Sequence, residues 1–407
     1  MNHRNKLKIF NDPIYGFISI PNSGIFDIIE HKYFQRLRRI SQMGMSYLVY
    51  PGAHHTRFHH ALGCMHLMQK AIQVLRFKGV DISETEADAL LKAILLHDIG
   101  HGPFSHAMEN SIVNDVNHEW ISLQFMEKLN TEFNQSLTLA IQIFKGEYHR
   151  KFFKDLISSQ LDIDRLDYLK RDSFYTGVAE GNINSERLIT MLNVHNDQLV
   201  IEDKGIYSVE KFLVARRLMY WQVYLHKTSL GAEQLLIRVL KRVKYLVSQG
   251  VDLPASSAFG YFLKNEITID DFTEETLEIF SKLDDYDIIS AMKEWQHSDD
   301  FVLSNLCGTI INRDLLKVKL KKKSIEISKV NAEKKKLIEK YKISEEEAAY
   351  FVFTGSVDNL AYSENQESVK VLHKNGKVSD VVKASDQLNL NALTKPVVKY
   401  YICYPKP

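Results

Sequence analysis

Cysteine, net charge and long apolar runs are all scarce in this 407-residue sequence. The three cysteines, Cys64, Cys307 and Cys403, are odd in number and far apart, so they predict a reducing compartment and no disulfide framework. A formal net charge of +1 gives no overall attraction to nucleic acid or to a membrane, so a charged partner must meet a local patch. No segment is apolar over the ~18 residues of a membrane span, and residues 1–8 lack the apolar core of a signal peptide. We therefore expect a cytoplasmic protein with no membrane partner.

Proline is rare in the long middle of the chain. Between Pro103 and Pro396 the only proline is Pro254, and apolar residues recur there at helical spacing. The apolar content of 45% is enough for a sizeable core. We predict a mainly α protein in which residues 1–312 form one helical domain, with a turn or short hairpin at residues 8–20 before the first helix.

The composition changes near Arg313. Residues 313–342 contain twelve basic and four acidic residues, the first few alternating with apolar ones in the manner of a strand. Residues 313–407 therefore predict a smaller C-terminal α+β lobe. Its expected elements are a strand at 316–320, a helix at 332–341, a strand at 350–354, a turn at Asn375-Gly376 between two short strands, and a strand at 397–404.

Histidine, in contrast, is crowded into one part of the chain. Nine of the sixteen histidines lie between His54 and His118, which is expected of metal or acid–base chemistry rather than of packing. Residues 83–96 predict an apolar helix that opens with a capping box and continues its buried face to His97 and Asp98. An imidazole and a carboxylate are costly to bury unless a divalent cation or hydrogen bonds hold them. The alternative is a hydrogen-bonded pair that ends a core helix.

A closed metal site needs further ligands from elsewhere in the chain. His60 begins an apolar stripe at helical spacing and is therefore predicted to face the core, whereas His59 and His66 are expected on the surface. His54 and His55 have no assigned role. Downstream, Asp164 shares a helical face with Tyr168 and with either Arg171 or Asp172, and neighbouring apolar positions predict partial burial. Asp164 is thus a candidate fourth ligand.

These residues resemble the HD-domain metal phosphohydrolases and, among them, the deoxynucleoside triphosphate triphosphohydrolases. His60, His97-Asp98 and Asp164 follow the H…HD…D pattern of the larger family. The closer resemblance rests on separated segments that agree in order: residues 11–16 (NDPIYG), 34–38 (FQRLR), 51–53 (PGA), 57–60 (RFHH) and 97–106 (HDIGHGPFSH). It covers roughly residues 8–230, and the C-terminal lobe matches only in general character.

The resemblance implies a metal ion and an acid–base pair. His60, His97, Asp98 and Asp164 would hold one divalent ion, for which nitrogen and oxygen ligands suit Mn, Fe, Ni, Co or Zn, with Mg as a second ion on the substrate phosphates. The implied catalytic set is His118, as general acid toward the leaving 5′-oxygen, Glu109, which orients it, and His101. Without the resemblance, His118 would be interpreted as a loop histidine.

The resemblance also implies a set of residues that contact the phosphates, sugar and base. Its members are Gln42, Met43, Arg57, His106, Arg165, Tyr168, Asp172, Arg216, Tyr220 and Tyr224. The last three lie four apart, which on a helix is one face, and a core stripe edged by tyrosine is the alternative. Met43 stands where relatives usually have leucine, and Arg165 where they have lysine, so ribose exclusion is less strict and the phosphate contact differs in geometry.

In the related enzymes a second nucleotide binds between subunits and orders an active tetramer. The residues that match this effector site are Lys8, Ile9, Asn11, Glu30, Gln35 and Arg38. Glu30 stands where guanine-reading relatives carry aspartate, and its carboxylate can still accept hydrogen bonds from a purine edge. The resemblance thus implies a GTP or dGTP activator and a homo-tetramer. The alternative is that Asn11 forms a turn while Gln35 and Arg38 brace a helix.

The expected function is metal-dependent hydrolysis of dNTP to deoxynucleoside and inorganic triphosphate. A first alternative is another HD-type phosphohydrolase, such as a nucleoside monophosphatase or a cyclic-nucleotide phosphodiesterase, although its smaller substrate needs fewer cationic contacts. A second is a nucleotide-sensing or nucleic-acid-binding module, which the lysine-rich residues 313–342 support. Such a run is usually a solvated face, so nucleic acid is the less favoured partner.

Overall fold

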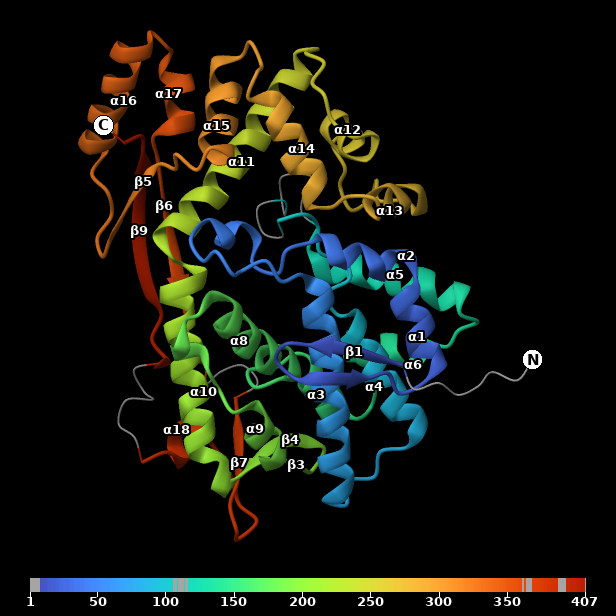
Figure 1. Cartoon of the computed structure of the whole chain (residues 1–407). Coiled ribbons are helices and arrows are strands. Elements are labelled where there is room, and N and C mark those ends of the chain that lie inside the picture. Colours follow the sequence, from blue (N-terminus) through green and yellow to red (C-terminus); the bar gives the residue numbers. More distant parts are fainter. Residues whose placement is uncertain are drawn as a thin grey trace.

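The computed structural model describes residues 8–104, 108, 113, 116–360, 362–363, 368–386 and 393–406. The chain is mainly helical, as the sequence predicts. Figure 1 shows the long helix α11 (Lys227–Ser248) running from the middle of the molecule to its top, with the other helices arranged beside it. None of the helices in the described ranges is long and apolar enough to cross a membrane.

The N-terminal segment forms the predicted hairpin. Strands β1 (Ile9–Asp12) and β2 (Gly16–Ser19) pair antiparallel, and the Asp12 carboxylate accepts hydrogen bonds from the backbone amides of Ile14 and Tyr15 in the turn. Asn11 therefore belongs to a strand rather than to a turn. Short helices follow: α1 (Ser23–Glu30), α2 (Lys32–Gln35), and the 3₁₀ segments η1 (Arg36–Arg39) and η2 (Gly44–Leu48).

Three helices form the centre of the fold. α3 (Arg57–Phe77) packs against both α4 (Glu84–Leu96) and α8 (Ile163–Thr176). The predicted capping box starts α4, since Ser83 and Glu86 each accept a hydrogen bond from the other's backbone amide. The intervening helices are α5 (His118–Glu132), α6 (Thr138–Lys145) and α7 (Lys151–Ile157).

A hairpin that the helical interpretation did not include follows α9 (Ser185–Met191). Strands β3 (Leu192–His195) and β4 (Gln198–Glu202) are joined by Asn196-Asp197, both with positive φ (49° and 60°), as a two-residue hairpin turn requires. The Asn-Asp pair between two apolar runs was a signal for it. The short segment η4 (Ala179–Gly181) precedes α9, whereas η5 (Asp203–Gly205), α10 (Ile206–Met219) and the π-helical segment η6 (Tyr220–Tyr224) follow β4.

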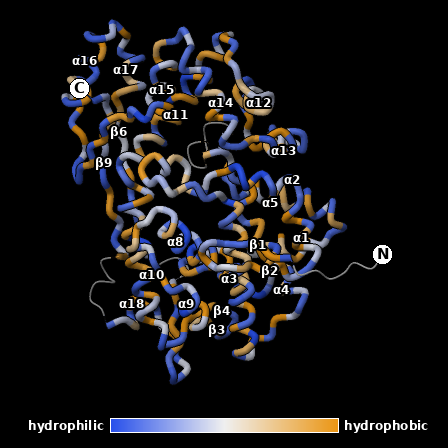
Figure 2. The backbone as a smooth tube through the Cα atoms, viewed as in Figure 1, coloured by the Kyte–Doolittle hydropathy of each residue, from blue (hydrophilic) through white to orange (hydrophobic). Residues whose placement is uncertain are grey.

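The upper layer in Figure 1 is helical. It includes α12 (Ser257–Lys264), α13 (Glu274–Phe280), α14 (Asp285–Trp295) and α15 (Phe301–Ile311), beside the upper part of α11. Figure 2 shows hydrophobic and hydrophilic residues alternating along these helices, as expected where one face is buried. The buried apolar side chains form one continuous cluster from Ile18 to Tyr404.

The C-terminal segment contains the predicted mixture of strands and helices. Its elements are β5 (Lys317–Lys321), α16 (Ile327–Tyr341), α17 (Glu345–Phe351), β6 (Phe353–Asn359), β7 (Lys370–Leu372), β8 (Val378–Asp380), α18 (Val381–Ala384) and β9 (Val397–Tyr404). The predicted strand at 350–354 has the wrong start, because residues 350 and 351 are still helical. A capping box of Ser344 and Glu347 starts a helix that runs to Phe351, and the strand follows it. The other predicted strands and the turn at Asn375-Gly376 are confirmed.

Two sheets include strands of this segment. One has the order β5-β9-β6, with β9 antiparallel to both neighbours. The other has the order β3-β4-β7-β8, in which β7 lies parallel to β4. Residues on either side of the predicted boundary at 312/313 thus share a sheet, and that boundary remains a prediction.

Candidate metal centre and adjoining pocket

The ends of the three central helices bring the four predicted ligands together. His60 lies in the first turn of α3, His97 and Asp98 directly follow α4, and Asp164 lies in the first turn of α8. Local sequence sets these positions, since Asp162 caps α8 by accepting from the Arg165 amide at 2.7 Å. Residues far apart in sequence therefore meet at one buried point.

The ligand atoms are close enough to share an ion. His60 Nε2 lies 3.1 Å from Asp164 Oδ1 and 3.8 Å from Asp98 Oδ2, while His97 Nε2 lies 3.4 Å from Asp98 Oδ1 and 3.6 Å from Asp164 Oδ1. Such separations are those of donors that would surround one cation at about 2.0–2.2 Å. The set of two imidazole nitrogens and two carboxylates suits a divalent transition metal.

The outer nitrogens of both imidazoles are held by neighbours. His97 Nδ1 donates to the Ile94 carbonyl at 2.7 Å, and His60 Nδ1 lies 2.8 Å from the Asp167 carboxylate. Each Nε2 lone pair is thereby directed into the cluster, as in carboxylate–histidine–metal arrangements. The buried His97 Nε2 makes no hydrogen bond to any described residue. An orphaned buried nitrogen facing two carboxylates fits a metal ion, and this supports the metal interpretation over the hydrogen-bonded pair.

The charges around Asp98 favour its ionised form. Burial alone would raise the pKa of Asp98, but His97, His101 and Arg57 hold it well below its usual range. Arg57 pairs directly with the Asp98 carboxylate. Burial, helped by Arg57, keeps the pKa of His101 well below its usual value, so His101 is neutral near pH 7. Asp98 is therefore available as an anionic ligand with a fixed orientation.

A second layer behind His60 was not predicted. The Asp167 carboxylate accepts a hydrogen bond from Arg171 Nε at 2.8 Å, and Arg171 Nη1 donates to the Asp12 carboxylate at 2.8 Å. All three side chains are buried. Burial opposes ionisation of Asp167, yet Arg171 and His60 lower its pKa to about 2. Gly63 leaves room for this pair, since a Cβ there would lie 2.1 Å from Asp167 Oδ1. The apolar stripe predicted His60 inside, but not the ion-pair chain behind it.

Arg36 is a further buried residue that sequence reasoning missed. Its guanidinium donates to the carbonyls of Ile99 at 2.8 Å, His101 at 2.9 Å and Leu283 at 3.3 Å, and its side chain has no exposed surface. Burial lowers its pKa to about 9. Arg36 thus ties the loop that carries Asp98 and His101 to the start of α14.

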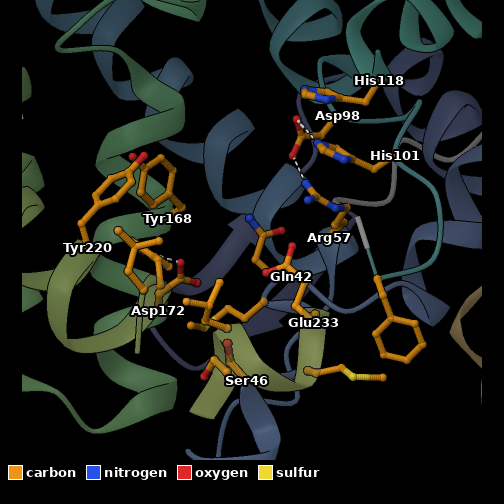
Figure 3. A pocket seen from close by; sticks show the side chains of 18 of the residues that line it. Gln42, Ser46, Arg57, Asp98, His101, His118, Tyr168, Asp172, Tyr220 and Glu233 are labelled. Atoms are coloured by element: carbon orange, nitrogen blue, oxygen red, sulfur yellow. Dashed lines mark hydrogen bonds and ion pairs between the residues drawn. The ribbon is translucent and has the colours of Figure 1, made fainter. Parts of the chain in front are cut away.

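A pocket of about 620 Å³ opens beside the metal cluster (Figure 3). This volume suits a nucleotide-sized ligand. The predicted site residues that line it are Gln42, Met43, Arg57, Asp98, His101, His118, Asp164, Arg165, Tyr168, Asp172, Tyr220 and Tyr224. Residues that were not predicted also line it, among them Ser46, Ser229, Glu233, Gln234 and Val357.

Two histidines stack at the metal side of the pocket. The rings of His101 and His118 lie 3.8 Å apart at 15°, and His101 Nε2 lies 3.4 Å from Asp98 Oδ1. Asn117 places His118 by capping α5, accepting from the Trp120 amide at 2.8 Å. The structure thereby puts the proposed general acid next to the metal ligands.

Several predicted residues lie elsewhere or differ in detail. His106 and Glu109 lie outside the described residues. Arg216 is not among the described lining residues, but it lies close enough to Tyr168 to oppose the rise of that phenol's pKa on burial. Tyr220 and Tyr224 belong to a π-helical segment rather than a regular helix, with rings 5.3 Å apart.

The structure resolves the alternatives around Asp172. Asp172 lines the pocket, whereas Arg171 is buried against Asp167 on another side of α8. Asp172 Oδ1 lies 2.6 Å from His55 Nε2, and Asp172 Oδ2 accepts from the Tyr224 hydroxyl at 2.7 Å. His55, which had no assigned role, thus orients a pocket residue. The prediction that His59 and His66 are solvated was wrong, since both are half-buried against the helix start and β-hairpin.

The residues of the predicted effector site lie on the N-terminal side of the molecule. Lys8, Ile9, Asn11, Glu30 and Arg38 are exposed. Gln35 Oε1 accepts from Arg38 Nε at 2.8 Å, and the Arg38 guanidinium lies 3.6 Å from the centre of the Phe58 ring. Gln35 also donates to the Ile29 carbonyl. These contacts fit the alternative in which Gln35 and Arg38 brace a helix. Lys8, Glu30 and Arg38 nevertheless leave charged groups on the surface.

Comparison with known proteins identifies the family. Residues 57–172 match the HD domain, and residues 183–251 match the HD associated region. The uncharacterized protein YwfO of Bacillus subtilis is 32% identical over 397 residues, 93% of this chain and 88% of that protein. A crystal structure of a phosphohydrolase from Bacteroides thetaiotaomicron has a TM-score of 0.95 at 51% identity, covering 98% of this chain and 100% of that one. This chain belongs to the HD-domain phosphohydrolases.

Some more distant relatives of this HD-domain phosphohydrolase have names that state a specific activity. The deoxynucleoside triphosphate triphosphohydrolase SAMHD1 homolog of Dictyostelium discoideum is 31% identical over 249 residues, 56% of this chain and 48% of that protein. The HD-domain match spans all four predicted ligands. The protein is therefore a metal-dependent phosphohydrolase, and its cluster of His60, His97 and Asp164 is the expected metal site.

Proposed function

We propose that the protein hydrolyses dNTP to deoxynucleoside and inorganic triphosphate. The observation that carries this proposal is the pocket, which joins the metal cluster to the cationic groups of Arg57 and Arg165 and to a large polar and aromatic chamber. A nucleoside monophosphate would leave much of such a chamber unfilled. The names of the SAMHD1 relatives support the same substrate.

The chain's own residues fit the steps of this reaction. Arg57 and Arg165 hold the phosphates, and the tyrosines of the opposite wall contact the sugar and phosphates. His118 gives a proton to the 5′-oxygen as the bond to the α-phosphorus breaks. A divalent ion bound by His60, His97, Asp98 and Asp164 would supply Lewis-acid polarisation and a water of lowered pKa.

The products and the position of bond cleavage test this proposal. With dATP in ¹⁸O-labelled water, we expect deoxyadenosine without label and triphosphate carrying one ¹⁸O, because water attacks at the α-phosphorus. Mass spectrometry and ion-exchange chromatography of the products measure this. Release of orthophosphate or pyrophosphate, or label in the nucleoside, contradicts the proposal.

We further propose that GTP or dGTP activates the enzyme by assembling a homo-tetramer through the surface that includes Lys8, Ile9, Asn11, Glu30, Gln35 and Arg38. An anionic nucleotide at a subunit boundary would engage Arg38 and Lys8, which are exposed, and stabilise the assembly by mass action. We expect GTP to raise both dATP turnover and the mass measured by light scattering, and Arg38→Ala to remove both effects. If mass and rate are indifferent to every added nucleotide, the effector site is absent.

A further inference from the structure

A continuous chain of buried polar side chains runs from the metal cluster to the N-terminal hairpin. His60 Nδ1 lies 2.8 Å from Asp167 Oδ2, which also accepts a hydrogen bond from Arg171 Nε at 2.8 Å. Arg171 Nη2 donates to Asp167 Oδ1 at 3.0 Å, and Arg171 Nη1 donates to Asp12 Oδ2 at 2.8 Å. His60, Asp167 and Arg171 have no exposed surface, and Asp12 is 7% exposed. The chain therefore links a metal ligand on α3 to a carboxylate on β1.

Asp12 fixes the outer end of this chain, because both of its oxygens are engaged. Asp12 Oδ1 accepts from the backbone amides of Ile14 at 2.9 Å and Tyr15 at 3.0 Å, while Oδ2 accepts from Arg171. A guanidinium is a planar fork, so hydrogen bonds at two of its edges set both its position and its orientation. The turn of the hairpin thus places Arg171, and Arg171 places the Asp167 carboxylate.

The hairpin is itself attached to the helix that carries His60. The rings of Phe10 on β1 and Phe58 on α3 lie 5.9 Å apart, edge to face. Gln69 of α3 donates to the Ser19 carbonyl of β2 at 3.1 Å. Figure 1 shows the hairpin lying against α3. Asp12 and His60 therefore keep a fixed relation to each other through packing as well as through the ion pairs.

Stability alone does not account for this chain, since replacing a buried ion pair with apolar residues is often neutral or stabilising. A metal-binding imidazole, in contrast, depends on the partner of its outer nitrogen, which sets the orientation and basicity of the ring. We propose that Asp12 is a positioning residue of the metal centre, which acts through Arg171 and Asp167 to hold His60 in its ligating orientation. The N-terminal hairpin is then part of the metal site, whichever phosphate ester the enzyme hydrolyses.

The test measures the affinity of the Co²⁺-loaded protein for its metal. A chelator of known Co²⁺ affinity is added stepwise, and the visible absorption of the bound ion gives the dissociation constant. Asp12→Asn keeps an oxygen for the turn amides but removes the charge that faces Arg171. We expect the dissociation constant to rise about 10-fold, the lower end of the range for outer partners of metal ligands. The exposed Asp27→Asn, on α1, is the matched control and should leave the dissociation constant unchanged.

A double-mutant cycle shows whether Asp12 acts through Arg171. In an Arg171→Gln background, Asp12→Asn should change the dissociation constant by less than about 2-fold, because the link is already broken. A direct long-range attraction between Asp12 and the cation would persist in that background. If Arg171→Gln does not fold, Arg171→Lys replaces it in the cycle, since an ammonium keeps the charge but lacks the fork that joins the two carboxylates.

The absorption spectrum of bound Co²⁺ is a second readout, because it depends on the geometry of the ligands. The spectrum should change in Asp12→Asn and stay as in the wild type in Asp27→Asn. An unchanged spectrum or dissociation constant in Asp12→Asn, or an equal effect of this substitution in both backgrounds, overturns the inference. A wild-type protein that binds no Co²⁺ overturns it together with the metal assignment. Neither readout uses a nucleotide, so a failure to release triphosphate from dNTP would contradict the proposed function alone.

Discussion

Purified protein should carry about one tightly bound transition-metal ion per chain, and His97→Ala should remove it. His97 Nε2 faces the Asp98 and Asp164 carboxylates, so alanine both deletes a ligand and leaves buried negative charge uncompensated. Elemental analysis by mass spectrometry measures the metal. Hydrolysis of any nucleotide should be lost with it.

Stability provides a second measurement of the same site. Because the metal binds the folded chain, chelation of the wild type should reduce the free energy of unfolding by about 3 kcal/mol, the value for a ligand near 100 times its dissociation constant. Chelation should then change little in His97→Ala. The exposed His297→Ala should keep its metal and its response to chelator. A His97→Ala protein that is folded and fully loaded would refute the assignment.

Replacing His118 by alanine should lower kcat by ~10²–10⁴ while metal content and fold are kept. His118 stacks on His101 at the edge of the metal cluster but is not one of the four ligands. The expected defect is therefore in proton transfer and not in metal loading. Steady-state kinetics with dATP and circular dichroism together measure it.

The leaving group separates a proton donor from a merely structural residue. A dNTP analogue with sulfur in place of the 5′-oxygen expels a thiolate, which needs little protonation. The loss of rate caused by His118→Ala should shrink strongly with this analogue if His118 is the acid. An equal loss with oxygen and sulfur leaving groups would show that His118 acts in some other way, and His297→Ala again serves as control.

The sequence predicted the parts of the site that local patterns encode. The buried face of α4 continues into His97 and Asp98, and the stripe of α3 begins at His60, so helical spacing alone placed these residues inside. The hairpin before α1 and the strand at 397–404 could also be predicted, because turn residues and runs of strand-forming residues indicate them.

The remaining parts depend on contacts between distant segments. Asp12 and Arg171 form an ion pair across 159 residues, and His55 reaches Asp172 across 117. No single-segment pattern reports such partners. Glu233 belongs to an ordinary amphipathic helix, and its sequence does not show that this turn of α11 borders a pocket. The hairpin of β3 and β4 was overlooked although its Asn-Asp turn was visible.

The order of strands in the C-terminal sheet has a consequence for how the enzyme matures during synthesis. β9 lies between β5 and β6, although it follows both in the chain. On the ribosome, β5 and β6 emerge first and lack their shared neighbour until Tyr404 has been made. Val357, which lines the pocket, sits opposite Lys399 of β9. A nascent chain can therefore assemble the metal ligands early, while the wall of the adjoining pocket closes among the last events of folding.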